Sequence, residues 1–285
     1  MIRLSAFSDE AGKELSVQIA ALLRNNIRLT ELRSVGGKNI ADLTADEARE
    51  ISSELKENGI RLSALGSPIG KVDISVDFQG YLEEVRRMCV LANILETDRI
   101  RIFSFFNAYE ERNRVITYLN QMVEVAKEYG VTLCHENEKK VYGDTVERVL
   151  DLKKNVSGLR FVYDPANYLQ CGELPSRTLP ALYGISTYFH IKDLIYETGE
   201  LVPAGCGDGS IDELIRRISD DTILTIEPHL MVFSGYNAID SEIMKHRFSF
   251  QSNEEAFDTA VAAVKKILTG NGYRYNQENG GYEKA

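Results

Sequence analysis

Cysteine is scarce in this sequence, and no two cysteines are spaced as a C-x-x-C pair. Four scattered cysteines in 285 residues are typical of reduced thiols and imply no disulfide framework. The chain also lacks any apolar run near the roughly 20 residues that a membrane-spanning helix needs, and the apolar part of residues 1–7 is too short for a signal peptide. We therefore expect a cytoplasmic protein with no membrane partner.

The sequence also has fewer basic than acidic residues. Lysine and arginine number 33 against 43 aspartates and glutamates, which gives a net charge of −10. A chain of this charge repels polyanions, which disfavours nucleic acid or an anionic membrane as its main partner. The hydrophobic share of 44% and the charged share of 27% are ordinary for a globular protein, and the length fits one large α/β barrel at least as well as two small domains.

Short apolar runs alternate along the chain with longer segments of helical periodicity. Strands are expected at residues 2–7, 27–33, 60–65, 100–105, 131–136, 159–163, 187–191 and 222–227. Helices are expected at residues 14–24, 44–58, 78–95, 110–129, 144–153, 174–183, 210–218 and 253–268. Eight strand and helix pairs in this order predict a single (β/α)8 TIM barrel over residues 1–270. The mostly polar residues 271–285 are expected to form a C-terminal tail that is frayed or draped on the surface.

Four of the expected strands end abruptly in a charged or polar side chain. These strand ends are Glu136, Asp164, His190 and Glu227. Side chains alternate faces along a strand. If the four strands are neighbours in one parallel barrel, all four side chains point into its mouth at the carboxyl end, where active sites of this fold lie. Three carboxylates and one imidazole in that place predict a site for a divalent metal.

Each of these residues also has a structural interpretation when taken alone. A single polar residue at a strand end can equally cap a loop, and a lone His190 would be read as a packed histidine. Four in register favour the metal site. His135 has the opposite parity to Glu136 and should face the helices. Glu138 lies two residues beyond the apolar run and is expected to be a loop charge or an outer partner of the site.

Four segments of the sequence carry a family resemblance. They are Cys134-His135-Glu136-Asn137-Glu138, Tyr163-Asp164-Pro165-Ala166-Asn167, Phe189-His190-Ile191-Lys192-Asp193 and Thr225-Ile226-Glu227-Pro228. They resemble the metal-binding motifs of the xylose isomerase-like sugar phosphate isomerase/epimerase family, over essentially all eight units. The resemblance implies that Glu136, Asp164, His190 and Glu227 bind one divalent cation. It also implies that Glu136 and Glu227 flank a small sugar substrate as acid/base groups, without specifying the sugar.

The predicted ligand set also indicates the metal and the reaction. Three carboxylates and one nitrogen suit Mn²⁺ or Mg²⁺, with Zn²⁺ as a further option. Such an ion can bind a ketone and its adjacent hydroxyl and stabilise the enediolate formed when a carboxylate removes the α-proton. We therefore expect a metal-dependent sugar, or sugar phosphate, isomerase or epimerase.

Other functions stay open from the sequence. A dehydratase of a keto-polyol or keto-inositol would use the same metal site, and a non-catalytic sugar-binding barrel would keep the fold. The apurinic endonuclease branch of the superfamily is disfavoured, because this acidic chain has only four histidines. The oligomeric state, including a homo-oligomer, also stays open.

Five residues are candidates for substrate binding. Lys192 has the parity of His190 and could hold a substrate oxygen. The epimerase branch often has a histidine three residues after the aspartate; this chain has Asn167 there, which cannot titrate, so a proton relay at that position is in doubt. Arg33, Lys71 and His229 could contact substrate, or could be paired structural charges and a loop histidine.

Local motifs predict how some helices begin. Thr44 with Glu47, and Ser210 with Glu213, have the spacing of a capping box. The glycine-rich run 205–210 could cradle a phosphate before a helix, but a tight turn is favoured because the run has no lysine or arginine.

Overall fold

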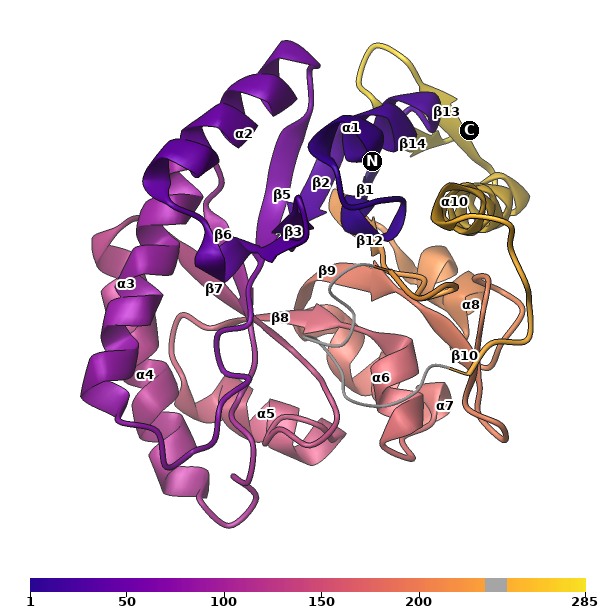
Figure 1. Ribbon diagram of the computed structural model, residues 1–285. Coiled ribbons are helices and arrows are strands. Elements are labelled where there is room, and N and C mark those ends of the chain that lie inside the picture. Colours follow the sequence, from indigo (N-terminus) through magenta and orange to yellow (C-terminus); the bar gives the residue numbers. More distant parts are fainter. Residues whose placement is uncertain (234–244) are drawn as a thin grey trace.

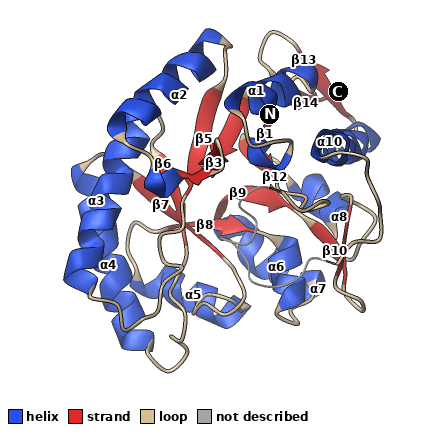
Figure 2. Cartoon of the chain, in the orientation of Figure 1, coloured by secondary structure: helices blue, strands red, loops and turns tan. Residues whose placement is uncertain are grey.

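A computed structural model describes residues 1–233 and 245–285, and it shows a curled β-sheet surrounded by helices (Figure 1 and Figure 2). Eight of its strands run parallel: β1 (Ile2–Ala6), β2 (Leu29–Leu32), β5 (Arg61–Gly66), β6 (Arg99–Ile102), β7 (Thr132–Glu136), β8 (Arg160–Tyr163), β9 (Ser186–Ile191) and β12 (Thr222–Ile226). They pair in the order β2, β5, β6, β7, β8, β9, β12, β1. This is the strand order of a TIM-barrel fold, as the sequence predicts.

The junction between β1 and β2 differs from the other strand pairs. These two strands contact each other, but no backbone ladder joins them among the described strands. Instead, the Thr30 hydroxyl donates a hydrogen bond of 3.0 Å to the carbonyl of Ala6. The prediction of an eight-stranded barrel is therefore correct in strand order, whereas the ladder of the curled sheet is not closed.

Helices cover the outer face of the sheet (Figure 2). They are α1 (Leu15–Arg24), α2 (Ala45–Glu57), α3 (Phe78–Ile94), α4 (Arg112–Glu128), α5 (Val146–Asn155), α6 (Pro165–Gln170), α7 (Pro175–Leu182), α8 (Ile211–Arg217) and α10 (Asn253–Gly270). Each predicted helix is present, and α6 is additional. Within the described residues, none of the helices has the length and apolarity that crossing a bilayer requires.

Short elements lie in the connections between the main strands and helices. They are the 3-10 turns η1 (Ser8–Glu10), η2 (Ile40–Asp42) and η3 (Tyr183–Ile185), and the strand pairs β3 (Ser34–Val35) with β4 (Lys38–Asn39) and β10 (Asp193–Ile195) with β11 (Glu200–Val202).

The two predicted capping boxes have different outcomes. Thr44 and Glu47 form the reciprocal pair at the start of α2, with each side chain accepting from the other residue's backbone N–H. Ser210 precedes α8 in the left-handed conformation, with φ 54°, and its side chain makes no capping hydrogen bond. The second capping box was therefore wrong.

The core has two layers on opposite sides of the strands. Most buried apolar side chains lie in one large cluster that includes Leu133 of β7 and Phe189 of β9. A separate small cluster contains Cys134, Val162 and Tyr188, together with Ala64. Each of these three lies two residues before a predicted metal ligand, so the strand parity assumed from the sequence holds inside the sheet.

The C-terminal segment forms structure that the sequence analysis missed. Strands β13 (Tyr273–Asn276) and β14 (Gly281–Lys284) make an antiparallel hairpin, and Tyr282 of β14 pairs with Ile2 of β1. Tyr273 and Tyr282 are buried. The expectation of a tail that is frayed or draped on the surface missed this hairpin, in which both tyrosines join the large apolar cluster.

Candidate metal centre

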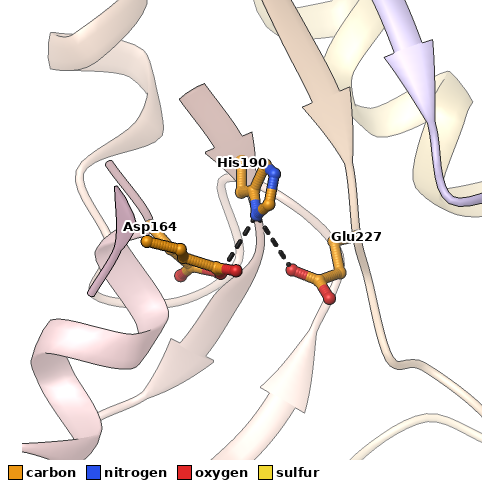
Figure 3. Close-up of side chains that lie close together, drawn as sticks. Asp164, His190 and Glu227 are labelled. Carbon is orange, nitrogen blue, oxygen red and sulfur yellow. Dashed lines mark hydrogen bonds and ion pairs between the residues drawn. The ribbon is translucent and has the colours of Figure 1, made fainter. Parts of the chain in front are cut away.

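The four predicted strand-end residues converge on one point. Each of Glu136, Asp164, His190 and Glu227 offers one donor atom, and these atoms lie within 4.8 Å of one another. All four side chains are buried. Figure 3 shows Asp164 and Glu227 approaching His190 from two sides at the ends of their strands. The structure therefore brings together the four side chains that the sequence singled out, and their role as metal ligands is taken up below as a proposal.

Asp164 is held by the start of α6. Its carboxylate accepts a hydrogen bond of 3.0 Å from the backbone N–H of Asn167, which makes Asp164 the N-cap. Pro165 occupies the first turn, where the missing N–H of proline would have no partner in the helix anyway. Asn137, the residue after β7, fixes the same point: its side-chain oxygen accepts from the N–H of Asp164 and its amide nitrogen donates to the C=O of Asp164, both at 3.0 Å. The Asp164 carboxylate is thereby aimed into the cluster.

Both ring nitrogens of His190 face carboxylates. Nδ1 lies 3.0 Å from Glu136 Oε1 and 3.3 Å from Glu227 Oε2, and Nε2 lies 3.0 Å from Glu31 Oε2. Burial lowers the pKa of His190, but Glu136 and Glu31 outweigh burial, so the pKa stands well above its usual value. The imidazole is therefore the central group of the cluster.

The surroundings of Asp164 and Glu227 shift the pKa values of these two carboxyl groups in opposite directions. Burial raises the pKa of Asp164. Burial also acts to raise the pKa of Glu227, but Lys192 and His190 reverse the effect and leave it well below the usual value. Lys192 Nζ lies 2.9 Å from Asp164 Oδ2 and 3.5 Å from Glu227 Oε2.

The donor set fits a divalent cation. Asp164 Oδ2 and Glu227 Oε2 are buried and, despite the nearby lysine, have no hydrogen-bond partner among the described residues. Oxygen atoms with free lone pairs beside an imidazole nitrogen are ligands that Mg²⁺, Mn²⁺ or Zn²⁺ can share. Glu136, Asp164, His190 and Glu227 are thus the residues that could hold the ion.

Arg101 is a part of the site that the sequence analysis missed. It lies on β6, with Nε 3.2 Å from Glu136 Oε2, and Nη1 donates to the carbonyl of Ser67 at 2.9 Å. Its guanidinium also stacks on the ring of Phe103, 4.5 Å from the centroid. The available signal was a charged residue between Ile100 and Ile102 in an apolar strand, where an unpaired charge would be costly.

Asn167 contacts the cluster directly. Its side-chain amide donates to Glu136 Oε1 at 3.1 Å and to the carbonyl of Asn137 at 2.9 Å. The position that often carries a histidine in the epimerase branch therefore holds a hydrogen-bond donor that fixes one orientation of Glu136.

Arg33 lies behind the cluster. Its guanidinium is 2% exposed, bonds Asp9 through two contacts of 3.0 Å and donates to Glu227 Oε1 at 2.9 Å. The rings of Phe7 and Phe233 lie 4.4 and 4.6 Å from it. The geometry supports the structural interpretation of Arg33, as a buried charge within the protein, over contact with substrate.

A second acidic group shares Glu227 with the first. Donor atoms of Glu10, Glu227 and His229 lie within 4.8 Å of one another. The Arg33 guanidinium already lies among them, 3.3 Å from both Glu10 Oε1 and His229 Nε2, and burial raises the pKa of Glu10 to about 8. The guanidinium of Arg33 therefore already supplies a positive charge to this group, and the first cluster is the candidate metal centre.

A cavity of about 880 Å³ opens over the cluster. The cluster and its neighbours contribute Glu136, Glu227, Asn167, Lys192 and His229 to its lining. Lys71 also lines it and lies 3.0 Å from Glu138 Oε2, so Glu138 is a charge of the cavity wall outside the cluster. The volume lies in the range of roughly 300 to 1,000 Å³ that small-molecule sites occupy.

Two of the remaining predictions concern residues near the site. His135 lies outside the cluster, with Nε2 2.9 Å from Ser104 Oγ and its ring against Phe161, as its parity predicted. The glycine-rich run is a turn around an internal carboxylate: the backbone N–H groups of Gly205, Gly207 and Gly209 donate to Asp193 at 2.8, 3.1 and 2.8 Å. The turn interpretation was correct, since Asp193 occupies the place that a phosphate would take.

Comparisons with known proteins agree with this fold. A family model described as xylose isomerase-like TIM barrel matches residues 24–231. The probable L-ribulose-5-phosphate 3-epimerase UlaE of Mycoplasma pneumoniae is 24% identical over 241 residues, which cover 79% of this chain and 78% of the relative. A solved L-ribulose 3-epimerase is 16% identical with a TM-score of 0.72, covering 95% and 96% of the two chains.

A further solved structure of similar fold is named as a dehydratase, not as an epimerase. The probable 3-DHS dehydratase AsbF of Bacillus anthracis is 18% identical to this chain, with a TM-score of 0.69 and coverage of 94% and 98%. At these identities the solved structures show a shared fold.

Proposed function

Because the chain belongs to the xylose isomerase-like TIM-barrel family, we propose that it is a divalent-metal-dependent isomerase or epimerase of a sugar or sugar phosphate. The observation that carries the proposal is the convergence of Glu136, Asp164, His190 and Glu227 beneath a cavity of about 880 Å³. The similarity to an epimerase over most of both chains supports the reaction class.

Glu136 and Glu227 would act as the two bases. Both line the cavity, whereas Asp164 directly follows β8 and His190 lies on β9, and these two strands lie between β7 and β12 in the sheet. Two carboxylates approaching a substrate from different sides can remove the proton beside a carbonyl on one face and return it on the other. A bound Mg²⁺ or Mn²⁺ would polarise that carbonyl.

The surrounding residues would keep these bases in place. Asn167 and Arg101 restrain Glu136, and Arg33 restrains Glu227. Lys192 lines the cavity, and its ammonium group would stabilise a substrate oxygen that gains negative charge nearby. Lys71 and His229 line the same cavity and could contact the rest of the sugar.

Exchange of the α-proton with solvent tests the proposal. The purified protein, loaded with Mg²⁺ or Mn²⁺, is incubated with ketoses, their phosphates and keto-inositols in D₂O and followed by NMR. An isomerase or epimerase incorporates deuterium and forms a new sugar. Loss of water from the substrate would identify the alternative dehydratase, and binding of a sugar without exchange would identify a binding barrel.

A further inference from the structure

Glu31 is a buried carboxylate that the proposed reaction does not use. It lies on β2, is fully buried, and is not among the described residues that line the cavity. Taking a carboxylate out of water is costly unless partners compensate. The burial of Glu31 therefore costs stability unless its neighbours compensate, and these neighbours indicate its role.

Both oxygens of Glu31 contact side chains of β9. Oε2 lies 3.0 Å from His190 Nε2, and the Tyr188 hydroxyl donates to Oε1 at 3.2 Å. In the sheet order, β12 and β1 lie between β9 and β2, so these contacts cross the inside of the curled sheet.

The pairing of β2 with β5 is irregular at this residue. Its register against β5 shifts between Thr30 and Glu31, whose partners are Leu62 and Ala64. The extra residue, Ser63, lies on β5, and a β-bulge of this kind re-aims neighbouring side chains. The irregularity therefore lies at the residue whose carboxylate reaches His190.

With a metal ion bound on the Nδ1 side, where Glu136 also lies 3.0 Å away, the Glu31 contact favours one tautomer of His190. An ionised carboxylate has only acceptors, so a hydrogen bond between it and Nε2 requires the proton on Nε2. In the neutral imidazole, Nδ1 then carries the lone pair, and Nδ1 is the nitrogen that faces Glu136 and Glu227 at 3.0 and 3.3 Å. The lone pair is thus directed into the cluster that could hold the metal.

We propose that Glu31 is a positioning residue that holds His190 as the Nε2–H tautomer, with Nδ1 aimed at the metal. The proposal rests on the proposed function, because it assigns His190 as a ligand. Carboxylates behind ligating histidines commonly raise metal affinity, and their loss costs roughly 10-fold to 100-fold. A purely structural Glu31 would link β2 to β9 and affect stability alone.

Metal affinity separates the two roles. Mg²⁺ binding is measured by calorimetry for the wild type, Glu31→Gln and Glu31→Ala. We expect affinity to fall by roughly 10-fold or more in both variants. Tyr273→Phe is the matched control, since it removes a buried hydrogen bond of 3.0 Å to the Ile218 carbonyl far from the cluster, and it should lower stability without changing affinity. If Glu31→Ala does not fold, Glu31→Gln decides.

The tautomer gives an independent readout. The chain has only four histidines, so ¹⁵N spectra of the Mg²⁺-loaded protein can be assigned by substitution. We expect His190 to be protonated at Nε2 in the wild type, with this proton slow to exchange with solvent because it is hydrogen-bonded to Glu31. In Glu31→Ala the metal-bound ring keeps the proton, and the proton should exchange faster. Affinities within about twofold of wild type in both variants, or His190 protonated at Nδ1 in the wild type, would overturn the proposal. If His190→Ala also kept wild-type affinity, the proposed metal site itself would fail instead.

Discussion

The guanidinium of Arg33 donates a hydrogen bond of 2.9 Å to Glu227 Oε1, although the two residues lie 194 positions apart in the chain. The same guanidinium forms ion pairs with Asp9 and Glu10, and all of these side chains are buried. A base at the cavity is thus tied to a buried ion network that begins in η1.

Arg33→Met should destabilise the protein strongly. The substitution leaves the buried Asp9 without its cation, and an unpaired buried charge costs about 3 to 5 kcal/mol. Urea unfolding of the metal-free protein measures the loss. The control is Arg24→Met: Arg24 pairs with Asp258 at 2.9 Å but is 40% exposed, so its loss should cost no more than about 1 kcal/mol. Equal effects in both variants would contradict the buried network.

Metal affinity should rise with pH. The pKa of His190 is raised by its carboxylate neighbours despite burial, and the pKa of Asp164 is raised by burial. Groups with raised pKa values retain protons to higher pH, and metal ligation must displace these protons. Calorimetric titration in buffers of different ionisation enthalpy should therefore detect proton release. Affinity that is constant or falls between about pH 6 and pH 8 would contradict the ligand assignment.

Glu136→Gln and Glu227→Gln should each bind metal and lose turnover. Glutamine keeps one ligating oxygen and the shape of the side chain but cannot act as a base. A missing acid/base group costs roughly 10²-fold in rate, measured on whichever sugar the wild type converts. Glu138→Gln is the control, because Glu138 lines the cavity but lies outside the cluster, and it should keep turnover within a few-fold. Near-wild-type rates in both cluster variants would mean that the proton is moved elsewhere, with Lys192 as the next residue to test.

Gly207→Ala should destabilise the turn between β11 and α8. A Cβ at Gly207 would lie 2.5 Å from Asp193 Oδ1 and would also press on the carbonyl of Leu194. Overpacking of this kind costs about 1 to 3 kcal/mol. Gly184→Ala is the control, since a Cβ there meets nothing within 4 Å. Thermal unfolding should separate the two variants, and equal melting temperatures would show that the Asp193 turn tolerates a side chain.

The residues of the cluster could be predicted because strand parity depends only on residues that are close in the sequence. Strand parity places Cys134, Val162 and Tyr188 on one face, and the next residues on that face are Glu136, Asp164 and His190. The capping box of Thr44 and Glu47 is equally local, since its partners are three residues apart.

The rest of the site depends on contacts between distant segments. Glu31 meets the cluster across the inside of the sheet, and Arg101 reaches Glu136 from the neighbouring strand β6. No periodicity reveals such partners. Ser210 failed as a cap for a related reason: Asp193 takes the hydrogen bonds of the preceding glycines, and the backbone reaches α8 with φ 54° at Ser210. Tertiary contacts outweighed the local motif at that position.

A crystal structure of the Mn²⁺-loaded protein tests the central claim most directly. Anomalous scattering locates the ion without assumptions about its ligands. We expect one peak within roughly 2.5 Å of donor atoms from Glu136, Asp164, His190 and Glu227, the range in which hard cations meet protein ligands, with His190 ligating through Nδ1. A fully occupied peak elsewhere in the protein, or no peak between these four side chains at saturating Mn²⁺, would contradict the account.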